Sequence, residues 1–548
     1  MKARFFILIG LTTLTFLFTT FSVYNLQISE GDDYRRKAHA QNEAAEALAA
    51  PRGIIYVTDK NGAKIPAALT KESPLIFAVP DEVHDPDPIA EVLTPILGID
   101  QDQLRAMLAK EQDKYELLSE DLTQVQIDQT KEFGLEGIYV ASKKHRYYPL
   151  ESLAAQVLGF VGLTEYSDTP NGRYGLEAYY DNELRGKNQS FSGSGLTEAV
   201  AGKDLELTID RNIQVRAEEI LSALVEEYRA ESGSVIVQDP RSGAILAMAN
   251  APSFDPNKYF EVDDIGLYTN TAVGSIYEPG SVFKIITVAA GIDSGAITPE
   301  TIYHDRGEVV LNGKTIKNWD LEAHGDITMT EAIENSVNTA MTYAEAQMGH
   351  ETFYKYLKKF GFKDRTEIDL PSEALGSLRP LEQDIRDINY ATASFGQGVS
   401  VTPIRLITAF SAIANDGILM RPFLNAEQKP SQVRRVISKE TADQVTEMMV
   451  SAVKKAFVAD IRHYDVAGKT GTAQVPDFVN GGYLEFSEGL INTYIGFAPA
   501  SNPQFTILIK LDKPYGSPFA GQTVVPAFKE LAQFILNYAQ IPPDNLDE

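Results

Sequence analysis

The segment Tyr277-Glu-Pro-Gly-Ser-Val-Phe-Lys-Ile-Ile-Thr-Val-Ala-Ala-Gly291 places a serine and a lysine at the start of an apolar run. Pro279 and Gly280 predict a turn, and the run behind them predicts a buried helix. Ser281 therefore lies at a helix N-terminus, where unpaired N–H groups and the helix dipole favour negative charge. Lys284 follows at i+3, so its side chain lies on the same face. By itself this pattern is also typical of an ordinary buried helix.

Two further strings follow in order, Ser336-Val-Asn338 and Lys469-Thr470-Gly471. A free lysine has a pKa near 10.4 and is a poor base at neutral pH. Burial beside a second ammonium lowers the pKa of Lys284, so that it can take the proton from Ser281. The ordered set supplies a nucleophile, a base, a second hydroxyl with an amide, and a second cation. This combination indicates acylation of a serine by a peptide or β-lactam carbonyl.

The surroundings of Ser336 predict a break between two helices. Thr328 and Glu331 have the spacing of a capping box for a short helix, and Asn335 and Asn338 are poor residues for a helix interior. A new helix is therefore expected from about Asn338. A loop at this point directs Ser336 as a proton shuttle and Asn338 toward a substrate amide, although an ordinary helix cap gives the same pattern.

The segment from Tyr464 to Val475 predicts a strand that carries Lys469. Its glycines allow close approach of a substrate backbone, and an extended peptide can add to a strand edge. A glycine-rich turn or half of a phosphate-binding loop is the alternative. A phosphate loop requires glycine five residues before Gly468, and His463 stands there, so that alternative fails.

The N-terminus predicts a membrane anchor. Phe5 to Ser29 carries no charged residue and spans roughly 37 Å as a helix, enough to cross a bilayer. Lys2 and Arg4 precede it, so residues 1–4 are expected in the cytoplasm, residues 5–29 in the cytoplasmic membrane as a single-pass signal anchor, and the rest outside. A cleaved signal peptide is the alternative, but the A-x-A-like stretch at 47–50 lies far beyond the apolar run.

Composition limits the class of protein. The chain has 548 residues, a net charge of −27 and no cysteine. The length predicts two or three domains, and the negative charge argues against nucleic-acid binding and suggests an acidic ectodomain. The absence of cysteine excludes disulfides and thiol chemistry. No metal and no organic cofactor are implied.

Periodicity predicts an α+β chain in which the catalytic strings lie in the second half. Residues 30–205 are expected to form an elongated mixed α/β pedestal domain with nothing catalytic, and 206–541 the catalytic domain, followed by an acidic tail at 542–548. Within the catalytic domain Asp210 caps a helix. The predicted strands are 234–239, 244–248, the segment around Lys469, 491–498 and 505–511, with a closing helix at 525–539. They imply a five-stranded antiparallel sheet flanked by helices.

At this point the chain resembles a class B penicillin-binding protein, a membrane-anchored peptidoglycan transpeptidase. The three strings carry the resemblance, together with Arg52–Gly62, Gly175–Gly186 and Phe395–Gly398 with Val401–Pro403. In the first of these additional segments, Thr58-Asp59 shifts the family spacing by one residue.

The resemblance implies a role for each position that matches a motif. Ser281 is the nucleophile and Lys284 its base. Ser336 and Asn338 form the second motif, and Lys469, Thr470 and Gly471 form the third. The oxyanion donors are the backbone N–H groups of Ser281 and Thr472. The implied reaction is D,D-transpeptidation of D-Ala-D-Ala stem peptides, blocked covalently by β-lactams. The implied partners are a polytopic lipid II polymerase and other cell-wall synthesis proteins. Tyr277–Gly280 resembles division or sporulation members more than elongation members.

Other functions were weighed on the same residues. The seven histidines show no local pairing with Ser281 and no G-x-S-x-G elbow occurs, which disfavours a Ser-His-Asp hydrolase. Glu308–Asn312 spells the E-x-x-L-N string of class A β-lactamases, but it precedes Ser336. Asn312-Gly313 also predicts a hairpin turn there. A β-lactam-hydrolysing or D,D-carboxypeptidase relative, and a catalytically idle division scaffold, remain alternatives.

Overall fold

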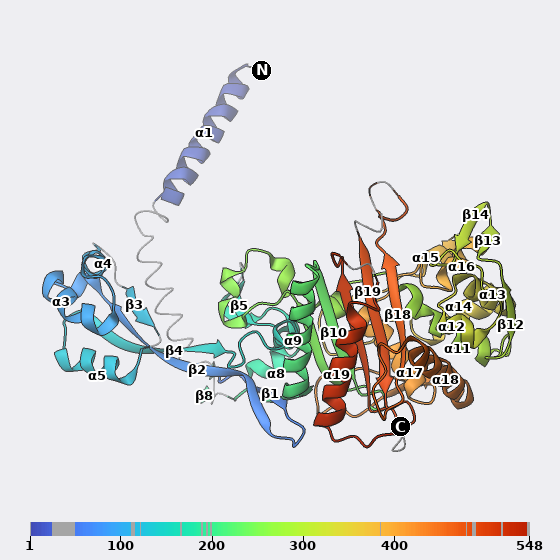
Figure 1. Ribbon diagram of the computed structural model, residues 1–548. Helices are drawn as coiled ribbons and strands as arrows, with labels where there is room; N and C mark the ends of the chain where they lie inside the picture. The colour runs from blue at the N-terminus through green and yellow to red at the C-terminus, as the bar shows by residue number, and fades with distance from the viewer. Residues whose placement is uncertain are drawn as a thin grey trace.

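The computed structural model describes residues 2–24, 50–110, 115–120, 122–164, 167–187, 190–192, 195–197, 200–383, 385–477, 479, 481–484, 489–516 and 519–544. These residues form a mixed α/β fold, as predicted. Figure 1 shows a small N-terminal lobe joined to a larger C-terminal body that contains a sheet between helices.

Helix α1 covers Lys2–Tyr24. Several of its large side chains are exposed, among them Leu11, Phe16 and Phe18. Within the described part of the chain, no helix combines the length and the hydropathy needed to cross a membrane. Residues 25–29 of the predicted anchor lie outside the described residues, and the anchor stays a prediction.

The first half of the chain contains mostly short elements. In order they are β1 (Ile55–Thr58), β2 (Lys64–Ala78), η2 (Pro80–Glu82), α3 (Pro86–Leu97), α4 (Gln101–Leu108), β3 (Glu116–Glu120), α5 (Gln124–Phe133), β4 (Ile138–Tyr147), α6 (Ala155–Leu158), β5 (Val161–Thr164), β6 (Ser167–Gly172), α7 (Gly175–Tyr179), α8 (Asp181–Arg185), β7 (Ser190–Ser192), β8 (Gly195–Thr197) and β9 (Leu205–Asp210).

The long strand β2 organises the N-terminal lobe, which we define as residues 64–147. It pairs with β4 from Leu69 to Ala78, with β3 near its end and with β1 at its start. At 15 residues, β2 is a long strand. Helices α3, α4 and α5 cover one side of it and share an apolar core. Strand β1, which precedes the lobe, also pairs in parallel with β9, which directly precedes the body.

A buried ion-pair group fixes the junction between lobe and body. The carboxylate of Glu177 on α7 is fully buried and binds Arg52 at 2.6 Å and Arg146 at 2.6 Å. Arg52 also binds Asp181 at 2.9 Å. Each arginine approaches from a different segment, so the three segments are held in one arrangement. The Arg52–Gly62 and Gly175–Gly186 segments that carried the sequence resemblance therefore meet here.

The C-terminal body begins after β9. Its elements are α9 (Arg211–Glu227), β10 (Ser232–Gln238), β11 (Ile245–Ala251), η3 (Pro256–Glu261), η4 (Ile265–Tyr268), α10 (Thr271–Gly274), η5 (Gly280–Phe283), α11 (Lys284–Asp293), β12 (Ile302–Asp305), β13 (Glu308–Leu311), β14 (Lys314–Lys317), β15 (Gly325–Thr328), α12 (Met329–Glu334), α13 (Asn338–Met348), α14 (His350–Lys359), α15 (Arg379–Gln383), α16 (Asp387–Ala393), α17 (Pro403–Ala414), β16 (Ile418–Met420), β17 (Gln432–Arg435), α18 (Lys439–Ala456), β18 (Ala467–Gln474), β19 (Leu490–Ala498), β20 (Phe505–Asp512) and α19 (Val524–Tyr538).

The main sheet of the body has the strand order β11-β10-β20-β19-β18, and all its neighbours are antiparallel. Every residue of β19, the neighbour of β18, is buried. Strand β18 ends the sheet, so one of its edges is unpaired in this order. An edge of this kind is the part of a sheet to which an extended peptide can add.

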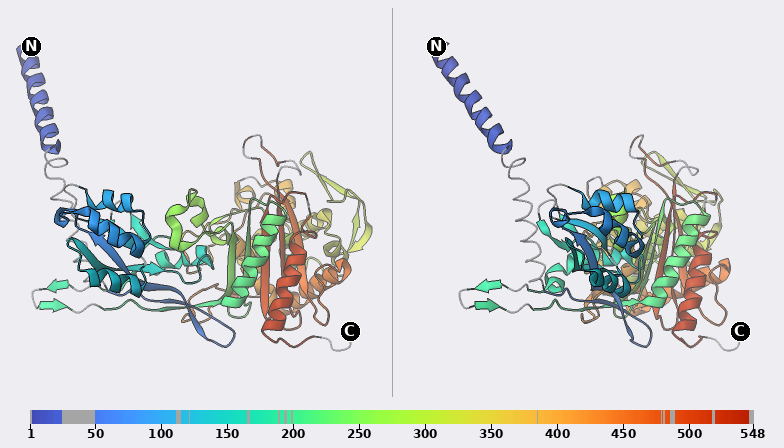
Figure 2. Two further views of the ribbon diagram at one scale, coloured as in Figure 1. Left: turned by 60° about the vertical axis from the view of Figure 1, so that its left-hand side comes forward. Right: turned by 90° about the vertical axis from the view of Figure 1, so that its left-hand side faces the viewer.

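Helices cover both faces of this sheet. Helices α9 and α19 lie side by side on one face, as Figures 1 and 2 show in green and red. Helix α17 packs on the other face, between the sheet and α18. All twelve residues of α17 are buried, Arg405 among them, so none of its faces is exposed to solvent. Helix α11 belongs to the same layer, so the segment at 277–291 lies inside the largest core of the protein.

Local predictions for the body are confirmed at several points. Asp210 caps α9 through hydrogen bonds from the N–H groups of Asn212 and Ile213. Thr328 and Glu331 form the predicted capping box. Asn312 and Gly313, with φ of 48° and 74°, connect β13 to β14 as the predicted hairpin turn.

Candidate active site

The turn before Ser281 is built by close backbone packing. Gly280 has φ of 60°, and its N–H donates to the carbonyl of Gly396 at 3.1 Å. A Cβ on Gly396 would lie 2.3 Å from the Gly280 carbonyl oxygen, so only glycine fits there. Ser281 is the second residue of the short helix η5 (Gly280–Phe283), and α11 continues from Lys284. The prediction of a turn followed by a buried helix is confirmed, with a 3-10 turn as its first part.

Lys284 reaches from α11 to the segment between α12 and α13. Its Nζ donates to the Ser336 carbonyl, and it lies 3.1 Å from the Ser336 Oγ. The side chain is fully buried, with 0% exposure. Lys284 therefore joins the first and second motifs directly.

Ser336 occupies the predicted helix break. Helix α12 ends at Glu334 and α13 begins at Asn338. Ser336 itself has φ of 57°, a left-handed conformation that is uncommon for residues other than glycine. The carbonyl and the hydroxyl of this same residue are the groups that contact Lys284.

Strand β18 brings the second lysine to the same hydroxyl. Lys469 Nζ lies 3.0 Å from Ser336 Oγ and 3.2 Å from the Thr470 carbonyl. Lys469 pairs with Ile495 of β19, and this register sets how far along the strand the ammonium lies. One hydroxyl thus lies within hydrogen-bond distance of two lysines that are 185 positions apart.

Gly471 allows η5 to approach β18. A Cβ at this position would lie 3.0 Å from the Pro279 carbonyl oxygen and 3.0 Å from a Val282 methyl group. Any side chain would therefore push the strand away from the turn that carries Ser281. The glycine of the third motif is needed for close packing within the protein, in addition to the expected approach of a substrate.

Burial lowers the pKa of both lysines. The pKa of Lys284 falls well below its usual value, first because the side chain is buried and second because the Lys469 charge lies near, while Asp320 opposes the shift. Burial lowers the pKa of Lys469 to about 8. The predicted direction for Lys284 is confirmed, and its neutral form can accept a proton near neutral pH.

The remaining predicted residues surround this centre. Asn338 Nδ2 donates to the Lys317 carbonyl at 2.8 Å, so the amide is held by strand β14. The Thr472 hydroxyl accepts from the N–H of Ala520 at 3.2 Å. Thr470 Oγ1 lies 3.4 Å from Lys469 Nζ. The structure therefore brings the predicted residues of the second and third motifs together, and η5 places Ser281 against β18.

Two residues that follow the β13–β14 hairpin, Trp319 and Asp320, contribute to the site and were not predicted from the sequence. The charge of Asp320 raises the pKa of Lys284 and so opposes the effect of burial. Trp319 donates from Nε1 to the Asn335 carbonyl at 3.1 Å. Trp319 also meets Phe519 edge-on, with the ring centroids 5.8 Å apart. No local motif identifies these positions. Trp319 is the chain's sole tryptophan, a compositional signal that did not by itself indicate a place in the fold.

The β-lactamase-like string has a structural role. Glu308 begins strand β13 and pairs with Lys317 across the hairpin at 3.6 Å. Both side chains are more than half exposed. The interpretation of Glu308–Asn312 as part of a hairpin is confirmed. Among the residues that the structure describes, no group of three His, Cys, Asp or Glu side chains has the arrangement of a metal site.

Comparison with known proteins assigns the two halves to two family models. Residues 233–533 match the penicillin-binding protein transpeptidase domain, and residues 47–192 match the penicillin-binding protein dimerisation domain. These ranges fall inside the predicted catalytic and pedestal ranges. The predicted boundaries themselves stay predictions.

Relatives extend over most of the chain. Stage V sporulation protein D of Bacillus subtilis is 34% identical over 85% of this chain and 75% of its own length. The peptidoglycan D,D-transpeptidase FtsI of Escherichia coli is 28% identical over 99% of this chain and 93% of its own. The crystal structure of penicillin binding protein 2X from Streptococcus thermophilus has the same fold, with a TM-score of 0.76, 24% identity, and coverage of 90% and 80%. The chain belongs to the penicillin-binding proteins, as a class B serine transpeptidase.

Proposed function

We propose that Ser281 carries the acyl group during cross-linking of peptidoglycan stem peptides, with Lys284 as its base and Ser336 as proton relay. One observation supports these roles above all others. Two buried lysines lie 3.1 Å and 3.0 Å from the same Ser336 hydroxyl, and one of them, Lys284, directly follows the helix η5 that contains Ser281. A hydroxyl between two such groups can pass a proton from one place to another.

The first half-reaction forms an ester. Neutral Lys284 takes the Ser281 proton, and the Ser281 Oγ attacks the carbonyl of the penultimate D-alanine. The backbone N–H groups of Ser281 and Thr472 stabilise the oxyanion. The C–N bond to the terminal D-alanine breaks, and the proton returns through Lys284 and Ser336 to the leaving amine.

The second half-reaction restores the serine. An amine of a neighbouring stem attacks the ester carbonyl, a new amide bond forms, and the C–O bond to Ser281 breaks. The amine proton passes to the base and then to Ser281 Oγ. In a β-lactam the broken amide is part of a ring, so the leaving amine stays attached and the ester persists on Ser281.

The substrate carboxylate is expected at Lys469 and Thr470. The protonated form of Lys469 supplies the cation, and Thr470 Oγ1 lies beside it at 3.4 Å. Asn338, held through its Nδ2 by the Lys317 carbonyl, retains its Oδ1 for a substrate N–H. Gly471 keeps β18 close to Ser281.

We also propose a single-pass location in the cytoplasmic membrane, with residues 1–4 inside and the catalytic domain outside. The charge-free run at 5–29 and the basic Lys2 and Arg4 support it. Threonine hydroxyls in α1 bond to carbonyls one turn earlier, such as Thr15 to Leu11 at 2.8 Å, which lowers their cost in lipid. Residues 30–205 would then raise the catalytic domain above the membrane and present docking surfaces to a lipid II polymerase.

A labelling time course tests the role of Ser281. The purified chain is incubated with a fluorescent penicillin, and the adduct is located by intact mass and peptide mapping. We expect one adduct on Ser281 that persists for minutes to hours. Ser281→Ala should remove it without lowering the melting temperature, whereas Ser294→Ala, at the C-terminal end of α11, should label normally.

Each alternative has a distinct result. Rapid loss of the adduct with release of hydrolysed drug would indicate a β-lactamase. Release of D-alanine without transfer to an amine would indicate a carboxypeptidase. A folded chain that forms no adduct would indicate an idle scaffold, and labelling of the Ser281→Ala variant would refute the assignment of the nucleophile.

A further inference from the structure

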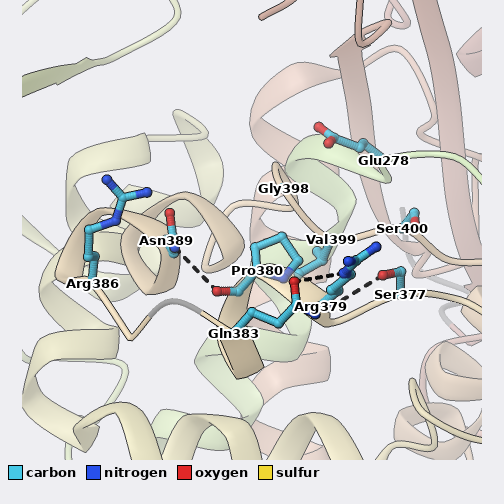
Figure 3. A pocket seen from close by; sticks show the side chains of 10 residues that line it. All are labelled: Glu278, Ser377, Arg379, Pro380, Gln383, Arg386, Asn389, Gly398, Val399 and Ser400. Atoms are coloured by element: carbon cyan, nitrogen blue, oxygen red, sulfur yellow. Dashed lines mark hydrogen bonds between the residues drawn. The ribbon is translucent and has the colours of Figure 1, made fainter. Parts of the chain in front are cut away.

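A cavity of about 420 Å³ lies behind the nucleophile turn. Figure 3 shows side chains from α15, from the start of α16 and from the segment at 398–400 around one hollow. The lining residues are Glu278, Ser377, Arg379, Pro380, Gln383, Arg386, Asn389, Gly398, Val399 and Ser400. We refer to it as the arginine pocket. No residue of β18, and neither Ser336 nor Asn338, lines it.

The chemistry of the arginine pocket suits a carboxylate. Arg379 Nε donates to Gln383 Oε1 at 2.7 Å, which orients the guanidinium along α15. Its two terminal nitrogens make no hydrogen bond to another described residue, so they remain available to a ligand. A guanidinium pairs with a carboxylate through two parallel hydrogen bonds. Arg386 adds a second cation to the lining of a pocket in a chain whose net charge is −27.

The acidic residue of the described lining, Glu278, is hydrogen-bonded to a residue outside the lining. Glu278 Oε2 accepts from the Tyr483 hydroxyl at 2.9 Å. Burial raises the pKa of the Glu278 carboxyl. The described lining therefore contains two arginines and one acid that is engaged elsewhere. Ser377 and Ser400 hydroxyls and the Asn389 amide supply neutral polar groups around them.

The arginine pocket shares its wall with the nucleophile turn. Tyr277 and Val401 exchange two backbone hydrogen bonds of 3.0 and 2.9 Å, and Gly280 donates to Gly396. The pocket residues Gly398 to Ser400 lie between these two attachments. Glu278 itself is three residues before Ser281. A peptide of a few residues, at about 3.3 Å per residue, can reach from this pocket to the ester.

The donor peptide leaves this pocket free in the reaction proposed above. The donor carboxylate is assigned to Lys469 and Thr470, and neither residue lines the pocket. A stem peptide that arrives as acceptor carries its own carboxylates and must place an amine at the Ser281 ester. We propose that the arginine pocket binds a carboxylate of the acceptor stem peptide through Arg379, an inference that rests on the proposed transpeptidase function.

The test compares two acceptors on the full chain. A donor thioester acylates Ser281, and transfer is followed to a synthetic stem tripeptide with a free side-chain amine and free carboxylates, or to the same tripeptide with every carboxylate amidated. Arg379→Gln should raise KM for the free-carboxylate acceptor about tenfold or more, because a charged hydrogen-bonded pair is lost. KM for the amidated acceptor should change less than about twofold, since no ion pair is involved.

Control variants separate charge from folding. Arg379→Lys keeps the charge and should recover part of the loss, and Arg462→Gln, an exposed arginine outside the pocket, should behave as wild type. Acylation by the donor and by penicillin should be the same in all four proteins. Direct titration calorimetry with the free-carboxylate tripeptide should show the same loss of affinity in Arg379→Gln and requires no turnover.

Three results would overturn the proposal. They are equal KM changes for both acceptors, an unchanged affinity for the free-carboxylate tripeptide in Arg379→Gln, and slower penicillin acylation in that variant, which would mean that Arg379 supports the nucleophile turn. Failure of the wild-type chain to form an acyl-enzyme would instead refute the proposed function. The calorimetric titration would still decide whether the arginine pocket binds the peptide.

Discussion

Replacing Lys469 with methionine should make the protein more stable at neutral pH while it abolishes acylation. Lys469 is 4% exposed, and burial lowers its pKa from the usual 10.5 to about 8. A tenfold change in proton affinity corresponds to about 1.4 kcal/mol, so the charged side chain costs the folded state about 3 kcal/mol at pH 7. Methionine avoids this cost and loses hydrogen bonds to Ser336 and Thr470, about 1 kcal/mol net. The expected gain in the free energy of unfolding is about 2 kcal/mol.

The pH dependence identifies the cause. The folded pKa lies below the unfolded one, so the unfolded chain holds more protons between pH 8 and 10.5. The contribution of Lys469 to the free energy of unfolding is therefore lowest below pH 8 and rises with pH across that window. Above pH 10.5 the cost of burying the charged side chain is gone. The advantage of Lys469→Met should shrink over the same range and reverse at the top, where only the lost hydrogen bonds remain.

Urea unfolding at pH 7, 9 and 10.5 measures this difference. The fluorescence of Trp319, the chain's sole tryptophan, reports on the C-terminal body that contains the site. Lys429→Met, at an exposed position, serves as the matched control and should show no pH-dependent difference. A Lys469→Met variant less stable than wild type at pH 7, by an amount that does not change with pH, would refute the reasoning.

Three further outcomes are expected. Gly471→Ala adds a Cβ 3.0 Å from a backbone oxygen of the nucleophile turn, so it should destabilise the protein by about 1–3 kcal/mol and slow penicillin acylation, both measured on the purified variant. Arg146→Met leaves the Glu177 carboxylate, with 0% exposure, short of one partner, and should lower the free energy of unfolding by about 3–5 kcal/mol in urea titration. The rate of penicillin acylation should fall as pH rises through about 8, where Lys469 loses the charge that holds the drug carboxylate; a rate that keeps rising to pH 10 would contradict that role.

Elements with local signals were predicted well. The turn and apolar run at 277–291, the capping box at Thr328 and the Asn312-Gly313 hairpin each depend on residues within a few positions of one another. Caps, turns and periodicity are local physical effects, so a single sequence contains them. The order of the three motifs also identified the family from the sequence, because each motif stood in the local context that its chemistry needs.

Other features were not predicted because they depend on contacts between distant segments. The parallel pairing of β1 with β9 and the 15-residue length of β2 follow from strands that meet across the fold. Arg379 and Arg386 of the arginine pocket lie in no motif, and only the packing of α15 and α16 against the segment at 398–400 makes them neighbours of Gly398. Side-chain direction at such places is set by the surrounding core.

The sequence by itself determined the chemical equipment: a serine at a helix start, a lysine one turn on, a hydroxyl with an amide, and a lysine on a strand. Only the tertiary structure decided that both lysines meet at Ser336. That meeting depends on the register of β18 against β19, on the left-handed turn at Ser336, and on the bare Gly471 that lets the nucleophile turn approach the strand. Local patterns specify elements, whereas the convergence of side chains far apart in the chain requires the packed core that holds those elements in place.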